Sequence, residues 1–239
     1  MFSAPAVIIL TAGMAIISHI CSLWDRNGRA QHRLARRWAR MLLAVCSVRS
    51  TVRGVEKLDP ATSYVVVANH SSYMDIPALY SALPLELRFF AKKGLFSIPL
   101  LGWHLQRAGH LPVVRGDARA SLKSMSDGAR LIRERGISVL LFPEGGRTET
   151  GIRPFKEGAA YIAIKAGVPV VPVGLVNMRA ILPMHSLRLR PGDIEINIGE
   201  PIDTADMTLH DRARLNEILR ERVTALALDQ AAPVTVHSH

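Results

Sequence analysis

The residues best suited to catalysis follow a hydrophobic run, Tyr64 to Ala68, in the segment Asn69-His70-Ser71-Ser72-Tyr73-Met74-Asp75. A strand that ends in polar residues delivers them to the carboxyl edge of a sheet, where α/β proteins place their sites. A carboxylate that holds one histidine nitrogen leaves the other as a base near neutral pH. The pattern predicts a helix capped by Ser71 or Ser72, with Asp75 one turn inside it and orienting His70. The same spacing also fits a cap without catalytic function.

A second polar segment follows another hydrophobic run and reads Phe142-Pro143-Glu144-Gly145-Gly146-Arg147-Thr148. The two glycines let the backbone turn tightly and present N–H groups, and Arg147 offers a planar fork for a phosphate or carboxylate. The alternative is a plain strand-to-loop turn with an exposed Glu144 and Arg147.

Two further segments carry cations beside apolar residues. Lys92 and Lys93 begin the stretch KKGLFSIPLLGW, a combination suited to an acyl chain beside a charged headgroup, and Arg115 follows two valines. The alternative for the first stretch is a hydrophobic loop packed on the core. Pro169 and Pro172 lie in the run VPVVPV, which predicts an edge strand or a bulge because proline cannot donate to a sheet ladder.

The elements that must position these residues are short β-branched runs separated by helical stretches, the signature of an α/β domain. The predicted strands are 64–68, 139–142, 170–175 and 194–198, and the predicted helices are 118–135, 158–166 and 209–228. A chain of 239 residues can bury one full core, so we expect one catalytic domain over residues 49–230. Residues 231–239 are expected to form a disordered tail.

The N-terminal segment from Phe2 to Trp24 contains no Asp, Glu, Lys or Arg. It is long enough to cross a bilayer core of about 30 Å as a helix. Positive charge follows this run rather than preceding it, so we expect it to be retained rather than cleaved as a signal peptide. Whether it spans the bilayer or lies flat in the interface stays open, and a buried core helix is the alternative.

The next segment is predicted to form a basic amphipathic helix that alternates with apolar residues such as Leu34 and Trp38. Its cations are Arg26, Arg29, Arg33, Arg36, Arg37 and Arg40. They can meet anionic headgroups while Trp38 enters the interface, so residues 1–48 are expected to be a membrane-binding helical pair. By the positive-inside bias, the rest of the chain would face the cytoplasm. No nucleic-acid motif accompanies the arginines, so nucleic acid is not an expected partner.

The composition also fits a protein that binds a membrane surface without crossing the membrane many times. The net charge of +10 favours an anionic partner. The mean hydropathy of +0.17 exceeds that of most soluble proteins, yet 21% charged residues exclude a multi-span membrane protein. Cys21 and Cys46 have no metal-ligand or redox spacing, so neither a disulfide framework nor a metal site is expected.

Taken in order, the four segments resemble the lysophosphatidic acid acyltransferase family, the 1-acylglycerol-3-phosphate acyltransferases, over roughly residues 50 to 205. NHSSYMD is similar to the N-H-x4-D block of that family, and KKGLFSIPLLGW is similar to its second block. FPEGGRT resembles F-P-E-G-T-R-S, and VPVVPVGL resembles the final proline-containing block. Four separated motifs in the right order are more specific than any one of them.

The resemblance implies a twisted mixed sheet flanked by helices, with the helical pair on the membrane. It implies that His70 deprotonates the acceptor hydroxyl as that hydroxyl attacks the thioester of acyl-CoA or acyl carrier protein, while Asp75 orients His70. No acyl-enzyme and no bound cofactor are implied. The block matched to glycerophosphate binding comprises Glu144, Gly145, Gly146, Arg147 and Thr148, and its other phosphate-side cations match Arg115 with Lys92 or Lys93.

One departure bears on the acceptor. Gly146 stands where the family usually has threonine, which puts one acceptor-side hydrogen bond in doubt. Another lysolipid, such as a lyso-ornithine lipid or lysophosphatidylglycerol, is therefore an alternative acceptor, and a non-catalytic membrane lipid-binding module is the alternative from another class. A serine hydrolase is disfavoured because the chain has no G-x-S-x-G segment. The expected location is the cell inner membrane, with the catalytic domain on its cytoplasmic side.

Overall fold

The computed structural model describes residues 3–25, 27–114, 116–186 and 188–228. Arg115 and the tail 231–239 lie outside these residues. The described chain forms a seven-stranded mixed sheet in the order β1-β7-β6-β2-β5-β3-β4. Neighbouring strands run parallel except for the antiparallel pair β6 and β7. The strands are β1 Val48–Arg53, β2 Val65–Ala68, β3 Leu87–Lys92, β4 Leu111–Val113, β5 Ser138–Leu141, β6 Val170–Val176 and β7 Gly192–Ile198.

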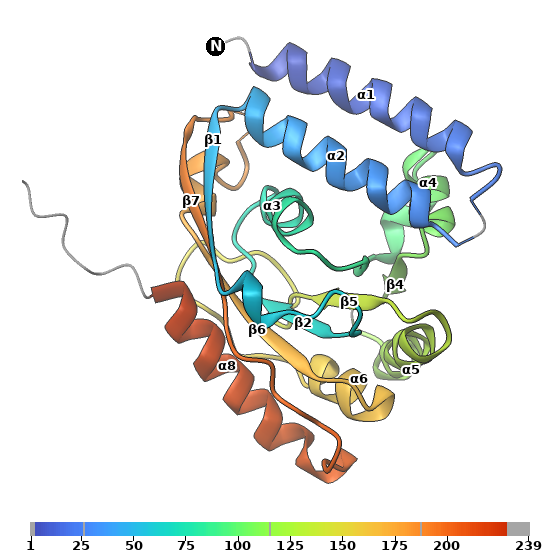
Figure 1. Cartoon of the computed structure of the whole chain (residues 1–239), viewed down its shortest axis with the longest axis vertical. Coiled ribbons are helices and arrows are strands. Elements are labelled where there is room, and N and C mark those ends of the chain that lie inside the picture. Colours follow the sequence, from blue (N-terminus) through green and yellow to red (C-terminus); the bar gives the residue numbers. More distant parts are fainter. Residues whose placement is uncertain (1–2, 26, 115, 187, 229–239) are drawn as a thin grey trace, which may run out of the picture.

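Helices cover both faces of this sheet. Figure 1 shows the sheet twisting strongly from β1 to β5, with α2 and α3 on one face and α5, α6 and α8 on the other. The α-helices are α1 Ser3–Cys21, α2 Arg29–Val45, α3 Asp75–Ala82, α4 Leu101–Arg107, α5 Ala118–Arg135, α6 Gly158–Ala166, α7 Met178–Ile181 and α8 Arg212–Leu228. Short 3₁₀ helices occupy η1 Val55–Lys57, η2 Lys93–Ser97 and η3 Leu209–Asp211.

Two hydrophobic cores lie on the two sides of the sheet because side chains alternate along each strand. In β2, Val66 packs into the core beneath α2 and α3, whereas Val65 and Val67 pack into the core with α6 and α8. All four residues of β2 are buried, and so are those of β5. The polar residues that follow β2 and β5 are therefore held at the centre of the sheet.

The predicted strands and helices are confirmed to within two residues, apart from the last helix, whose first turn is η3. Of the two alternatives for the proline run, the edge strand was wrong, because β6 lies between β7 and β2, whereas the bulge agrees with the irregular pairing around Pro172. Pro172 is tolerated where the ladder with β7 is interrupted. Val173 pairs with Ile198, Val170 pairs with Ile202, and the Pro172 carbonyl accepts the Gly199 N–H between them.

The N-terminal helices form an outer layer over α3. α1 packs on α2, and Ser18 and His19 of α1 contact α4, through a 2.8 Å hydrogen bond to His104 and a ring contact with Trp103. Among the described residues, no helix combines the length and apolar character needed to cross a membrane. Many large apolar side chains are nevertheless exposed on and just after α1: Ile8, Ile9, Ile16, Ile17, Ile20, Leu23 and Trp24.

Candidate active site

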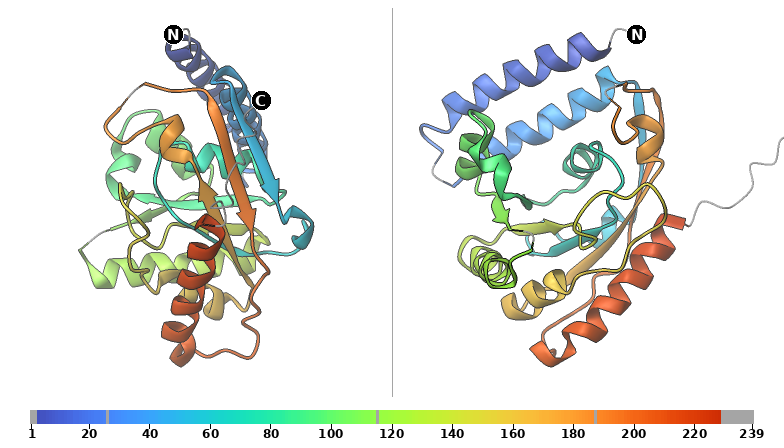
Figure 2. Two further views of the ribbon diagram at one scale, coloured as in Figure 1. Left: turned by 90° about the vertical axis from the view of Figure 1, so that its left-hand side faces the viewer. Right: turned by 180° about the vertical axis from the view of Figure 1, so that it is seen from behind.

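The site begins where β2 ends. The side chain of Asn69 accepts the N–H of Leu175 at 2.7 Å and donates to its carbonyl at 2.9 Å. This amide thus extends the pairing of β2 with β6 by one residue and leaves His70 at the carboxyl edge of the sheet. Figure 2, right, shows this region from behind, with the yellow loop after β5 in view.

His70 and Asp75 form a direct pair. The Nδ1 atom of His70 lies 2.6 Å from Oδ2 of Asp75, and the Asp75 side chain is fully buried while 11% of the His70 side chain is exposed. An ionised carboxylate can only accept, so Nδ1 donates the proton and Nε2 carries the lone pair. This arrangement can supply a general base.

The helix cap differs from the sequence-based prediction. Asp75 is the first residue of α3 rather than a residue one turn inside it. Its Oδ2 atom accepts the N–H groups of Ser71 and Ser72 at 2.8 and 2.9 Å, so Asp75 orders the turn that the serines were expected to order. The Ser72 hydroxyl accepts the N–H of Met74 at 3.2 Å and donates to the Leu182 carbonyl at 2.9 Å. One carboxylate therefore fixes both the loop and the imidazole.

The loop after β5 encloses the same histidine. The ring of Phe142 stacks on the ring of His70 with centroids 4.0 Å apart and planes 15° apart. Glu144 accepts the His70 N–H at 2.7 Å and the Arg153 N–H at 3.0 Å. Thr148 donates its N–H to the His70 carbonyl at 3.0 Å. The two polar segments therefore form one hydrogen-bonded unit.

Glu144 is buried, and its carboxylate oxygens each accept a backbone N–H. Burial raises the pKa of its carboxyl, whereas the N–H groups of Arg153 and His70 act in the opposite direction. The sequence assigned Glu144 and Thr148 to the acceptor. In the structure both side chains are buried, and both residues hold the backbone of His70.

Arg147 of this loop lies against Tyr73, which stands between His70 and Asp75 in the sequence. Its guanidinium carbon sits 3.6 Å from the ring centroid of Tyr73, which is exposed. The turn that leads to Arg147 contains Gly145 at φ +73°, a conformation that favours glycine. The sequence did not single out Tyr73, and its place between His70 and Asp75 was the only signal available.

The remaining predicted cations lie farther along the same edge. Lys92 ends β3, Lys93 begins η2, and both are exposed. β3 is separated from β2 by β5 alone, and all three strands are parallel, so Lys92 emerges at the same edge roughly 10 Å from β2. Arg115 is outside the described residues.

Other residues that build the site were missed because their contacts join segments far apart in the sequence. Leu175 and Leu182 are ordinary hydrophobic residues in the sequence, and Asn69 and Phe142 were read only as members of the two polar segments. Among the described residues, no group of three or more His, Cys, Asp and Glu is placed to hold a metal ion.

Comparison with solved structures shows the fold. The crystal structure of the 1-acyl-sn-glycerophosphate acyltransferase from Thermotoga maritima matches with a TM-score of 0.75, covering 97% of this chain and 99% of that one at 21% identity. At this identity the likeness concerns the fold alone, a mixed sheet flanked by helices with a helical pair at the N-terminus.

Sequence comparison gives the family. A chloroplastic 1-acyl-sn-glycerol-3-phosphate acyltransferase of Brassica napus is 38% identical over 80% of this chain and 56% of its own length. A Chlamydomonas reinhardtii protein of the same description is 36% identical over 84% of this chain and 61% of its own. The chain thus spans less than two thirds of these relatives. The family model described as Acyltransferase matches residues 49–176, more than half of the chain and all of the His70–Asp75 and Phe142–Thr148 segments, so the chain belongs to the acyltransferase family.

Proposed function

We propose that this protein transfers a fatty acyl group from acyl-CoA or acyl carrier protein to the sn-2 hydroxyl of 1-acyl-sn-glycerol-3-phosphate, giving phosphatidic acid. The observation that carries the proposal is the His70–Asp75 pair at the carboxyl end of β2, enclosed by the loop from Phe142 to Thr148. The names of the relatives support the choice of acceptor.

The pair has the geometry for a single displacement. Nε2 of His70 takes the proton of the acceptor hydroxyl as the hydroxyl oxygen attacks the thioester carbonyl. The new C–O bond forms, the C–S bond breaks, and the imidazolium returns the proton to the leaving thiolate. Asp75 stabilises the imidazolium through its 2.6 Å contact with Nδ1. Such a base commonly contributes a factor of roughly 10² to 10⁴ to the rate.

The acceptor phosphate would bind along the same edge of the sheet. Arg147 follows β5, the strand beside β2, and Lys92 and Lys93 follow β3, the next strand. Guanidinium and ammonium groups there would hold a phosphate while its glycerol hydroxyl reaches His70. Gly146 leaves this part of the turn without a side-chain hydroxyl.

The helical pair would place this site on the membrane, where acceptor and product reside. α1 exposes apolar side chains, and the arginines of α2 lie in the next layer. An apolar helix with cations beside it suits the boundary between acyl chains and headgroups. We propose that the protein binds the inner membrane with its catalytic domain on the cytoplasmic side.

Assay of the purified protein in lipid vesicles tests the reaction. Lysophosphatidate, lysophosphatidylglycerol and a lyso-ornithine lipid are offered separately, each with acyl-CoA and with acyl carrier protein, and His70→Ala serves as the inactive control. Phosphatidic acid formed by the wild type alone supports the proposal. If only another lysolipid is turned over, that lysolipid is the acceptor in place of lysophosphatidate. If none of the three lysolipids is turned over, a lipid-binding module is favoured. Complementation of a strain lacking its lysophosphatidate acyltransferase gives an independent readout.

A further inference from the structure

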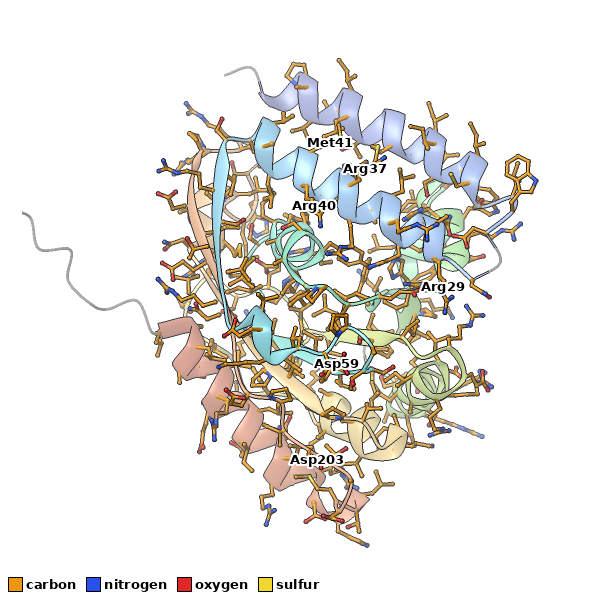
Figure 3. The ribbon with its side chains drawn as sticks, in the orientation of Figure 1. Arg29, Arg37, Arg40, Met41, Asp59 and Asp203 are labelled. Carbon is orange, nitrogen blue, oxygen red and sulfur yellow. The ribbon has the colours of Figure 1, made fainter. Side chains whose placement is uncertain are left out.

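A basic hollow lies on the N-terminal helical pair, outside the catalytic site. It has a volume of about 370 Å³, and among its lining residues are Cys21 at the end of α1 and Leu34, Arg33, Arg36, Arg37 and Arg40 of α2. We call it the arginine pocket. Figure 3 labels Arg37 and Arg40 on the side of the molecule that also shows Asp59, which precedes β2. The described lining includes no residue of the segments 70–75 and 142–148 that form the catalytic site, so the two sites are separate.

The four arginines gather charge that the described protein does not neutralise. None of them forms a salt bridge with a described residue, whereas Arg29 of the same helix pairs with Glu86. Arg33, Arg37 and Arg40 are spaced three or four residues apart, where like charges on a helix repel one another. Arg36 is partly buried, and its pKa is lowered first by burial and then by the charge of Arg40. An anion bound here would relieve this repulsion.

The position of the pocket relative to the membrane indicates which anion it would bind. α1 is the outermost layer in Figure 1 and exposes Ile16, Ile17 and Ile20, and α2 lies directly beneath it. If α1 enters the acyl region, the pocket lies one helix nearer the water, at the level of the lipid phosphates. A guanidinium fork matches the geometry of phosphate oxygens, and Leu34 offers an apolar wall.

We propose that the arginine pocket binds the phosphate headgroup of an anionic phospholipid in the leaflet on which the protein rests, as a site separate from the one that binds the acceptor. The proposal rests on the membrane placement of α1 proposed above. It adds that this placement depends on one defined pocket rather than on the net charge of the whole protein.

Vesicle flotation compares phosphatidylcholine vesicles with vesicles that also contain phosphatidylglycerol. Arg37→Gln/Arg40→Gln removes two pocket charges, and Arg214→Gln/Arg222→Gln removes two exposed charges from α8 as the matched control. With about 1 kcal/mol per basic contact, the pocket variant should bind anionic vesicles roughly 30-fold more weakly than wild type. The control variant should stay within about threefold of wild type.

Cys21 reports directly on occupancy because it lines the pocket and is a free thiol. Its alkylation by N-ethylmaleimide is measured on its own peptide by mass spectrometry, and buried Cys46 in the same digest reports any unfolding. Dihexanoyl phosphatidylglycerol, below its micelle concentration, should slow alkylation of Cys21, and dihexanoyl phosphatidylcholine should not.

Each other outcome has a distinct meaning. Equal losses in the pocket and control variants would overturn the pocket in favour of diffuse charge attraction. If both short-chain lipids protect Cys21 from alkylation equally, the arginine pocket is an apolar groove without headgroup recognition. If inorganic phosphate protects Cys21 equally well, the pocket is a site for soluble anions. Failure to float with either vesicle would instead refute the membrane placement itself, and Cys21 protection would still test the pocket.

Discussion

The carboxylate of Glu144 accepts the backbone N–H of His70 at 2.7 Å, which ties the loop after β5 to the histidine after β2. The residue that the sequence assigned to substrate binding therefore also fixes the position of the proposed base. We expect Glu144→Gln to lower kcat about 10- to 100-fold and to leave the KM for the acceptor within about threefold, because the amide can accept only one of the two N–H groups.

Unfolding of the same variant provides its structural readout. A buried N–H left without an acceptor costs about 1–3 kcal/mol, so denaturant titration should show a loss of that size. Glu149→Gln, at an exposed position of the same loop, is the matched control. A raised KM with unchanged kcat would show that Glu144 contacts the acceptor directly.

His70→Ala should reduce turnover by a factor of roughly 10² to 10⁴ because it removes the proton acceptor. Vesicle flotation and the circular dichroism spectrum should match those of the wild type. Activity is measured with a short-chain soluble acceptor, so that membrane delivery does not limit the rate. Turnover within about threefold of wild type would contradict the proposed role of His70 as the general base.

Arg147→Ala should raise the KM for the phosphorylated acceptor with a smaller effect on kcat, because a guanidinium on the phosphate adds binding energy without moving the proton. Tyr73→Ala should produce part of the same effect, since the ring supports Arg147 at 3.6 Å. Tyr73→Phe keeps the ring and is the matched control. A rise only in the KM for the acyl donor would reassign Arg147 to the other substrate.

Two N-terminal deletions distinguish the role of α1 from that of α2. The sequence indicated a boundary at residue 48 between the helical pair and the catalytic domain, but Ala39, Leu42 and Leu43 of α2 belong to the hydrophobic core, and Val48 begins β1. Deleting residues 1–48 should therefore unfold the protein. Deleting residues 1–24 should release it from vesicles and leave turnover of a short-chain acceptor intact. Circular dichroism monitors folding in both, and tight vesicle binding by the folded shorter deletion would mean that the membrane surface lies elsewhere.

Acidification should destabilise the contact between α2 and β3. Burial, with help from the charges of Arg88 and Arg36, lowers the pKa of His32 to about 4. The unfolded chain then binds the proton first, so stability is fully present above pH 6.5 and falls as the pH drops toward 4. The full shift corresponds to roughly 3 kcal/mol. Thermal unfolding of His32→Gln should depend less on pH over this window, and His210→Gln, at an exposed position, should behave as wild type.

The sequence alone determined the α/β class, the central strands and the two polar segments. It could do so because runs such as Val65–Ala68 and Ser138–Leu141 are buried on both faces, and because their polar successors must emerge at one edge. The His70–Asp75 pair was also predicted, since both residues belong to one turn and need no distant partner.

Only the tertiary structure decided how these parts support one another. Glu144 reaches the His70 N–H across 74 residues and Asn69 pairs with Leu175 across 106, and local patterns carry no information on such pairings. The proline run illustrates the same limit, because Pro172 is tolerated in a central strand only through an interruption in the partner strand. The arginines of α2 were visible as a periodic stripe. Their gathering beside Cys21 depends on how α1 packs on α2, which amphipathic periodicity in one helix does not specify.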